Sequence, residues 1–310
     1  YEHLFTLAVE ASVMPRLLNE DGWSRHVRLG NMQDSVRDLL SRGIPEPGEG
    51  PRRPCVLITG HTGSWELLGY TMALLGFPMH ALFRPLDVKP LDRWMRQTRE
   101  NRGLVLVDKF GATEALPRLM EQGYPVGFVA DQNAGDRGLF VPFFDRLASA
   151  YKSIGLLALK YEAPIICGQA RRLVWEHDAI GTPKADVLDS PVGGEVGFGI
   201  WRGEPFRYQI DVIDVIHPND WVDQPDPLFY VTARYRRAVE TMVRRAPEQY
   251  LWMHRYWKSR PRHEHLGREM PKAMREKIEK LPWMTQGQLD RILDWTRRDT
   301  QTLAEQPAKA

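Results

Sequence analysis

The sequence predicts an α/β fold with a mostly parallel central sheet flanked by helices. From residue 55 onward, short β-branched runs alternate with helical stretches, which is typical of βαβ units. The runs are apolar along their whole length, as in strands that are buried on both faces of a sheet. The composition agrees, because 43% hydrophobic and 26% charged residues in a chain of 310 are ordinary for a globular protein.

Each expected element follows from its apolar pattern and from the Gly and Pro residues that bound it. The expected strands are Cys55–Thr59, Met79–Phe83, Leu104–Val107, Val126–Ala130, Pro164–Gly168 and Arg207–Ile216. The expected helices are Trp65–Leu75, Leu91–Asn101, Thr113–Gln122, Ser153–Tyr161 and Pro227–Arg245. Residues 175–205, rich in Gly and Pro, are expected to be irregular.

Composition divides the chain into three parts. Residues 1–50 form a helical segment and a Pro/Gly linker, residues 51–261 the α/β domain, and residues 262–310 a charged amphipathic helical extension. Between Lys258 and Lys280, eight basic residues face four acidic ones, with apolar residues interleaved. This stretch either lies along an anionic membrane surface or packs as a solvated helix on its own domain.

The charge balance and the absence of several motifs exclude some classes of function. Lys and Arg number 42 against 40 Asp and Glu, a formal charge of +2, so no global field attracts nucleic acid. The phosphate-binding loop with its Lys is absent, and Ser64 does not lie in the G-x-S-x-G pattern of hydrolases. Three histidines, His254, His263 and His265, lie in an Arg-rich run and are expected to be solvated rather than metal ligands. No metal and no cofactor are expected.

The most informative stretch runs from Gly60 to Glu66. A buried strand ends just before His61, and a helix begins near Ser64, so the imidazole should project at the carboxyl edge of the sheet, where α/β proteins bind ligands. If Glu66 folds back onto the ring, the two side chains form a general base with its orienting acid. The alternative is that His61 packs at the strand end while Glu66 stabilises the helix N-terminus.

Two further polar groups end neighbouring strands. Arg84 follows the second expected strand, where its guanidinium either grips a phosphate or forms an ion pair with Asp87 or Asp92. Asp131 and Gln132 follow the fourth strand, and they contribute polar groups to the site or form an Asx turn. The aromatic-rich loop over residues 138–146 either folds into the core or lines an apolar slot.

Four blocks of sequence together resemble the bacterial lipid A biosynthesis acyltransferase family, the lauroyl and myristoyl transferases, over about residues 17–261. The blocks are Gly60–Glu66, Phe83–Asp87, Asp131–Gln132 with the following Phe-Val-Pro-Phe-Phe, and Pro247–Trp252 with Trp257–Pro261. The resemblance implies a glycerolipid acyltransferase-like fold. It also implies that His61 and Glu66 form the family's H-x4-D/E pair and that Arg84, Asp131, Gln132 and Ser64 bind substrate. Ser64 departs from the family pattern, because many members carry Asn there.

The resemblance and the chemistry of the residues together predict an acyltransferase. It would move a fatty acyl group from a thioester of acyl carrier protein or coenzyme A to a hydroxyl of a lipid or glycolipid, with backbone amides of the 60–64 turn stabilising the oxyanion. Candidate residues for an acyl pocket are Trp65, Phe83, Phe140, Phe143 and Phe144.

Two alternatives to this function stay open. One is a thioesterase or lipid hydrolase that uses the same His61 and Glu66 to activate water. The other is a non-catalytic protein that binds lipid at a membrane surface. The family resemblance implies a location at the cytoplasmic face of the bacterial inner membrane, either peripheral or through an anchor outside this sequence.

Overall fold

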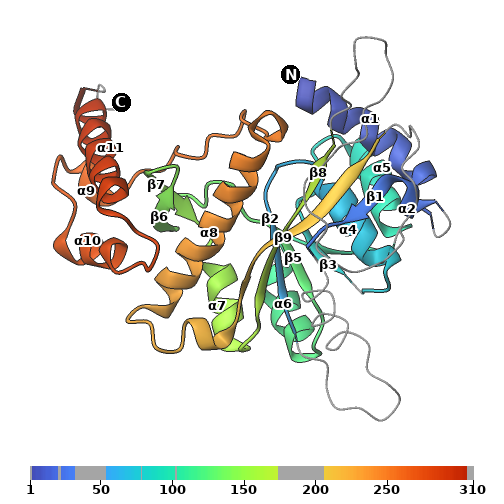
Figure 1. The fold of residues 1–310 in the computed structure, drawn as a ribbon, viewed down its shortest axis with the longest axis horizontal. Coiled ribbons are helices and arrows are strands. Elements are labelled where there is room, and N and C mark those ends of the chain that lie inside the picture. The colour runs from blue at the N-terminus through green and yellow to red at the C-terminus, as the bar shows by residue number, and fades with distance from the viewer. Residues whose placement is uncertain are drawn as a thin grey trace.

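The computed structural model describes residues 2–19, 22–31, 54–77, 79–101, 103–173 and 206–305 (Figure 1). In these residues the chain forms a seven-stranded sheet with helices on both faces and a separate two-stranded hairpin. The prediction of an α/β fold with a mostly parallel sheet is therefore confirmed. The end of the expected N-terminal helical segment, most of the Pro/Gly linker and the irregular stretch 175–205 lie outside the described residues.

The order of strands across the sheet brings three strand ends together. Every neighbouring pair is parallel except β8 with β9. Across the sheet the strands are β1 (Val27–Leu29), β9 (Tyr208–Ile216), β8 (Ile165–Arg172), β2 (Val56–Thr59), β5 (Val126–Val129), β3 (His80–Phe83) and β4 (Val105–Asp108). Because β2, β5 and β3 are adjacent and parallel, the loops that follow them meet at one edge of the sheet.

Helices cover both faces of the sheet, and the last three form the C-terminal segment beside the hairpin (Figure 1). They are α1 (Glu2–Leu17), α2 (Trp23–His26), α4 (Trp65–Leu74), α5 (Lys89–Glu100), α6 (Ala112–Glu121), α7 (Lys152–Lys160), α8 (Pro227–Arg245), α9 (Arg262–His265), α10 (Lys272–Glu279) and α11 (Gln286–Glu305). Two short 3-10 turns, η1 (Pro218–Asp220) and η2 (Pro247–Gln249), flank α8. Among the described residues, no helix has the length and apolar character needed to cross a bilayer.

Alternation along the strands creates two hydrophobic cores, one on each face of the sheet. On β2, Val56 and Ile58 face the core formed with α6, α7 and α8, whereas Leu57 faces the core that contains Leu67 of α4. Successive side chains of a strand point to opposite faces, so a wholly apolar strand is buried on both. This confirms the physical basis on which the strands were predicted.

The aromatic-rich segment expected as a loop is instead an antiparallel hairpin of β6 (Leu139–Phe143) and β7 (Arg146–Ala150). Its two turn residues, Phe144 and Asp145, have φ of 53° and 55°. A two-residue turn with both φ positive matches the twist of paired strands but normally uses Asn or Gly, so the sequence did not reveal it. Phe143 is fully buried in the core, as the core alternative predicted.

The C-terminal segment packs on the hairpin and on α8 (Figure 1). Ile278 and Leu281 are buried in the main core, so at least this part of the segment's apolar surface is packed on its own domain and is not free to enter a membrane surface.

A buried ion network stabilises this packing. Arg260 binds both carboxylate oxygens of Glu264, at 2.7 and 2.8 Å, and also contacts Asp299 at 2.6 Å. Arg146 of β7 donates from Nε to the same Asp299 at 2.8 Å.

The turn between β2 and α4 depends on Gly63. Its φ is +60°, a left-handed conformation, and a Cβ placed on it would lie 2.0 Å from the carbonyl oxygen of Ala170. The close approach allows two backbone hydrogen bonds, from the Gly63 amide to the Gln249 oxygen and from the Ser64 amide to the Ala170 oxygen, each 2.8 Å long. The turn that carries His61 is thereby joined to β8 and to η2.

We therefore predict that Gly63→Ala lowers the free energy of unfolding by about 2 to 4 kcal/mol, because the methyl group collides with backbone. The matched control is Gly76→Ala, since Gly76 also has positive φ, +87°, but a methyl group added there would have nothing within 4 Å. That variant should lose only about 1 kcal/mol, the conformational cost alone. Urea denaturation followed by circular dichroism measures both, and equal losses would contradict the steric explanation.

Candidate active site

Three polar side chains lie where neighbouring strands end. His61 follows β2, Asp131 follows β5 and Arg84 follows β3. In the register of the sheet, Thr59 pairs with Val129, so the residues two positions further on, His61 and Asp131, are at the same level. The strand order, which the sequence pattern alone does not reveal, therefore brings a histidine and a carboxylate together.

Asp131 holds the His61 ring and its backbone at once. The imidazole Nδ1 lies 2.7 Å from Oδ1 of Asp131, and the His61 amide donates to Oδ2 at 2.9 Å. An ionised carboxylate only accepts hydrogen bonds, so Nδ1 carries the ring proton and donates it to Oδ1. The other ring nitrogen, Nε2, keeps its lone pair and can accept a proton from a substrate.

Asp131 has no exposed surface, yet its environment favours the charged form. Burial by itself raises the pKa of this carboxyl group, but the hydrogen bonds and charge of His61 and the positive charge of Arg236 outweigh it, and the pKa is lowered. Asp131 is thus the ionised partner that a general-base histidine requires.

Two aromatic rings clamp the imidazole edgewise. Trp65 lies 4.9 Å from the His61 ring centroid and His254 lies 4.6 Å away, with interplanar angles of 69° and 62°. Burial and the neighbouring His61 lower the pKa of His254, so this ring is neutral near neutral pH. Its Nε2 lies 3.3 Å from the amide nitrogen of Gln132, which donates to it.

The prediction that three histidines are solvated is wrong for two of them. His254 is half-buried beside His61, and His263 is buried, whereas His265 is exposed. The loop that carries His254 is held at the site because the Leu251 amide donates to the His61 oxygen at 2.9 Å. Among the described residues, no group of His, Cys, Asp and Glu side chains is arranged to hold a metal ion.

Glu66 does not orient the imidazole, contrary to the expectation from the sequence. Its carboxylate forms a bidentate ion pair with Arg99 of α5, in which the Arg99 Nε donates to Oε2 at 2.9 Å. The ring of Trp65 lies against His61 on the side of α4. The physical reason is that a permanently charged, forked guanidinium binds a carboxylate more strongly than a neutral imidazole does.

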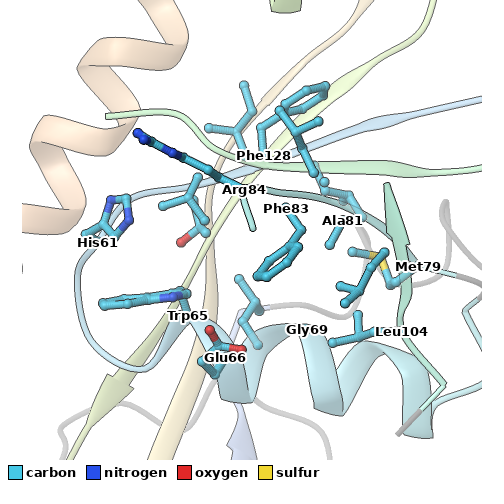
Figure 2. A pocket seen from close by; sticks show the side chains of 18 of the residues that line it. His61, Trp65, Glu66, Gly69, Met79, Ala81, Phe83, Arg84, Leu104 and Phe128 are labelled. Atoms are coloured by element: carbon cyan, nitrogen blue, oxygen red, sulfur yellow. The ribbon is translucent and has the colours of Figure 1, made fainter. Parts of the chain in front are cut away.

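A cavity of about 880 Å³ opens beside His61 and runs between α4 and the sheet (Figure 2). Its polar end holds His61, Arg84, Gln132 and Asn133. Away from that end the wall is mainly aliphatic and aromatic, and it includes Leu68, Met72, Met79, Ala81, Phe83, Leu104, Phe128 and Ile166. Figure 2 shows Met79, Ala81 and Leu104 at the end farthest from His61. A long apolar cavity that ends at a histidine can hold a hydrocarbon chain with its reactive end at the imidazole.

The structure brings some of the predicted site residues to this cavity and leaves others away from it. Trp65, Phe83, Arg84 and Gln132 line it, and no ion pair joins Arg84 to Asp87 or Asp92 within the described ranges. Ser64 is 1% exposed and does not line the wall, and Asp131 lies behind His61. The three remaining aromatics are in the hairpin instead, namely Phe140, Phe143 and Phe144.

The backbone amides expected to stabilise an oxyanion are already bonded. The amides of His61, Gly63 and Ser64 donate to Asp131, Gln249 and Ala170 respectively. This part of the prediction is therefore wrong for those three donors, because the same bonds are what hold the turn in place.

Three charged or titratable residues at the site were missed by the sequence analysis: Arg99, Arg236 and His254. Each comes from a helix or loop far along the chain from His61, and nothing in its local pattern indicates the contact. For Asp131 a signal was present, namely the abrupt change from an apolar strand to polar residues after Ala130. Two such changes at adjacent strand ends indicate one shared site.

We predict that Glu66→Gln costs about 1.5 to 3 kcal/mol of folding free energy, because it leaves the largely buried Arg99 without its counter-charge. The matched control is Glu279→Gln, which breaks the exposed pair between Arg275 and Glu279, and should cost no more than about 0.5 kcal/mol. Equal urea midpoints for the two variants would show that the Glu66–Arg99 pair stabilises the fold no more than an exposed ion pair does.

A known protein family matches part of the chain. No curated protein matches the sequence significantly. A family model described as bacterial lipid A biosynthesis acyltransferase matches residues 49–177, which include His61, Glu66, Arg84, Arg99 and Asp131. Residues 49–177 are thus similar to the bacterial lipid A biosynthesis acyltransferase family, which confirms the predicted resemblance over this part of the chain.

Proposed function

We propose that this protein transfers a fatty acyl group from a thioester, of acyl carrier protein or coenzyme A, to a hydroxyl group of a lipid or glycolipid. His61 is the general base, and Asp131 rather than Glu66 orients it. The observation that carries the proposal is the 2.7 Å contact between His61 Nδ1 and Asp131 at the mouth of an apolar cavity of about 880 Å³.

The reaction proceeds by direct transfer. As the acceptor hydroxyl oxygen attacks the thioester carbonyl carbon, its proton moves to Nε2 of His61, and Asp131 stabilises the imidazolium that forms. The tetrahedral intermediate then collapses, the C–S bond breaks, and the thiolate leaves and takes the proton back from His61. Proton transfer of this kind contributes about 10² to 10⁴-fold to the rate. Because a thiolate is a good leaving group, no acyl-enzyme is needed.

The two ends of the cavity bind different parts of the substrates. The apolar wall receives the acyl chain, which places the thioester at His61. At the polar end, Arg84 is exposed and has no carboxylate partner among the described residues, so its guanidinium is available to a phosphate of the acceptor or the donor. Water must be kept from the thioester for transfer to dominate over hydrolysis.

The proposed site of action is a membrane surface, at the cytoplasmic face of the bacterial inner membrane. Exposed apolar side chains close to the mouth in sequence support this: Val88, Leu91 and Trp94 follow the lining residues 84–87, and Trp252 and Met253 adjoin the loop bonded to His61. Trp and aliphatic side chains of this kind favour the interface between water and lipid.

We predict that His61→Ala lowers the rate of acyl transfer by at least about 10²-fold, and Asp131→Asn by about 10² to 10⁴-fold, since Asn destabilises both the required tautomer and the imidazolium. The measurement is transfer from a radiolabelled acyl thioester to a lipid acceptor, with thermal unfolding as the control for folding. A folded His61→Ala variant with wild-type turnover would exclude the mechanism.

The same assay separates the alternative functions. Release of free fatty acid at a rate that does not change when acceptor is added would identify a hydrolase. Liposome binding without any thioester turnover would identify a lipid-binding protein.

We also predict that Ala81→Leu shifts the preference towards shorter acyl chains, because the added carbons fill the end of the cavity near Met79 and Leu104. Each methylene that no longer fits should cost about 1 to 3 kcal/mol in the transition state. Competition between acyl thioesters of different length measures the shift, with Ala273→Leu, on the exposed surface of α10, as the matched control. An unchanged preference in Ala81→Leu would reject this cavity as the acyl site.

A further inference from the structure

A buried arginine lies directly behind the His61–Asp131 pair. Arg236 of α8 has no exposed surface, and its guanidinium carbon lies 4.1 Å from the centre of the Phe143 ring. Its Nη1 donates to the carbonyl oxygen of Ala130, the residue before Asp131, at 3.0 Å. Its Nε and Nη2 have no hydrogen-bond partner within the part of the chain that the structure describes.

Arg236 differs in this respect from three other arginines that have little exposed surface. Arg99, Arg172 and Arg260 each form a bidentate pair with a carboxylate. No ion pair is formed by Arg236 among the described residues, although burying an uncompensated charge is costly. A counter-charge must therefore act on it through space.

The groups that face Arg236 identify that counter-charge. From α8 and from the loop after η2, three phenols act on it: Tyr235, Tyr250 and Tyr256. Burial raises the pKa of each phenol, so all three are neutral at physiological pH. From the end of β5, Asp131 is the ionised group, and the positive charge of Arg236 is one of the causes that lower its pKa. The hairpin contributes the uncharged ring of Phe143.

We propose that Arg236 is a positioning residue for the His61–Asp131 pair: its buried positive charge adds to the contacts that keep Asp131 ionised, and it opposes the uptake of a proton by the pair. Its bond to Ala130 also fixes the backbone from which Asp131 extends. The inference rests on the proposed function, in which His61 must be unprotonated to act as the base.

The direction of the effect follows from the signs of the three charges. When His61 is neutral, the positive Arg236 and the negative Asp131 balance each other. When His61 binds a proton, the buried group carries one excess positive charge, which Arg236 disfavours. Without Arg236, the imidazolium and Asp131 would balance instead, so the pair would keep its proton to higher pH. At neutral pH a larger fraction of His61 would then be unable to accept a proton.

The test is the pH dependence of acyl transfer in three variants. Arg236→Gln removes the charge and keeps a hydrogen-bond donor on the side chain, and it should move the acidic limb of kcat/KM to higher pH by about one unit or more, while the rate recovers towards that of the wild type in alkali. Arg236→Lys keeps the charge and should keep the limb in place. The matched control, Arg237→Met, removes an exposed charge from the next position of α8 and should leave the profile unchanged.

A second measurement does not depend on activity. In nuclear magnetic resonance spectra of the wild type, the Nε resonance of Arg236, assigned from its loss in Arg236→Lys, should shift over the same pH range as the His61 ring. In folded Arg236→Gln the His61 ring should titrate at higher pH.

If Arg236→Gln does not fold, the titration of the wild type alone decides between the outcomes. An Arg236 resonance that ignores the His61 titration, or a folded Arg236→Gln with an unchanged acidic limb, would overturn the inference. If the wild type transfers no acyl group but the resonances are coupled, the proposed function fails while the role of Arg236 stands.

Discussion

The site depends on a carboxylate that is removed from water and shared between the ring and the backbone amide of one histidine. Asp131 determines which nitrogen of His61 carries the proton, and it also holds the backbone that carries the ring. This double contact exists only because β2 and β5 are adjacent and in register, with Thr59 opposite Val129. The register of the sheet therefore sets the distance between His61 and Asp131. A rigid scaffold positions functional groups on its loops in this way.

The two titratable residues of the His61–Glu66 motif have different tasks in this fold. His61 faces the open end of the cavity, whereas Glu66 forms the ion pair with Arg99 in its wall. Two guanidiniums, those of Arg96 and Arg99, lie over the ring of Phe83 at 4.6 and 4.9 Å. Since Phe83 is itself part of the wall, the Glu66–Arg99 pair keeps an apolar surface in place beside the reactive group. A cavity built this way keeps its shape when it is filled and emptied.

Most helices and strands of the α/β domain, though not the β6–β7 hairpin, were predictable, because the strands are short and apolar and most elements are bounded by Gly, Pro or a polar turn. The expected helix 227–245 coincides with α8, and the expected strands differ from β2, β3 and β5 by one residue at an end. The order of those strands was not predictable, because wholly apolar strands carry no information about their neighbours. For that reason Glu66, five residues away in the chain, was chosen as the partner of His61 instead of Asp131, seventy residues away. His254 and Arg236 were hidden for the same reason, since only the packing of α8 and the loop after η2 brings them to the strand ends.

The C-terminal helices share one carboxylate with the rest of the protein. Asp299 of α11 accepts from Arg146 in the hairpin and contacts Arg260, and the residue before Arg260, Ser259, exchanges hydrogen bonds with Asn133 at the cavity mouth. A chain shortened before residue 299 would leave two guanidiniums competing for Glu264 in a place that water hardly reaches. Because Ser259 is bonded to Asn133, a shift of Arg260 would also change the position of Asn133 at the mouth of the cavity. Although the family match stops at residue 177, hydrogen bonds and ion pairs thus connect α11 to the mouth of the cavity.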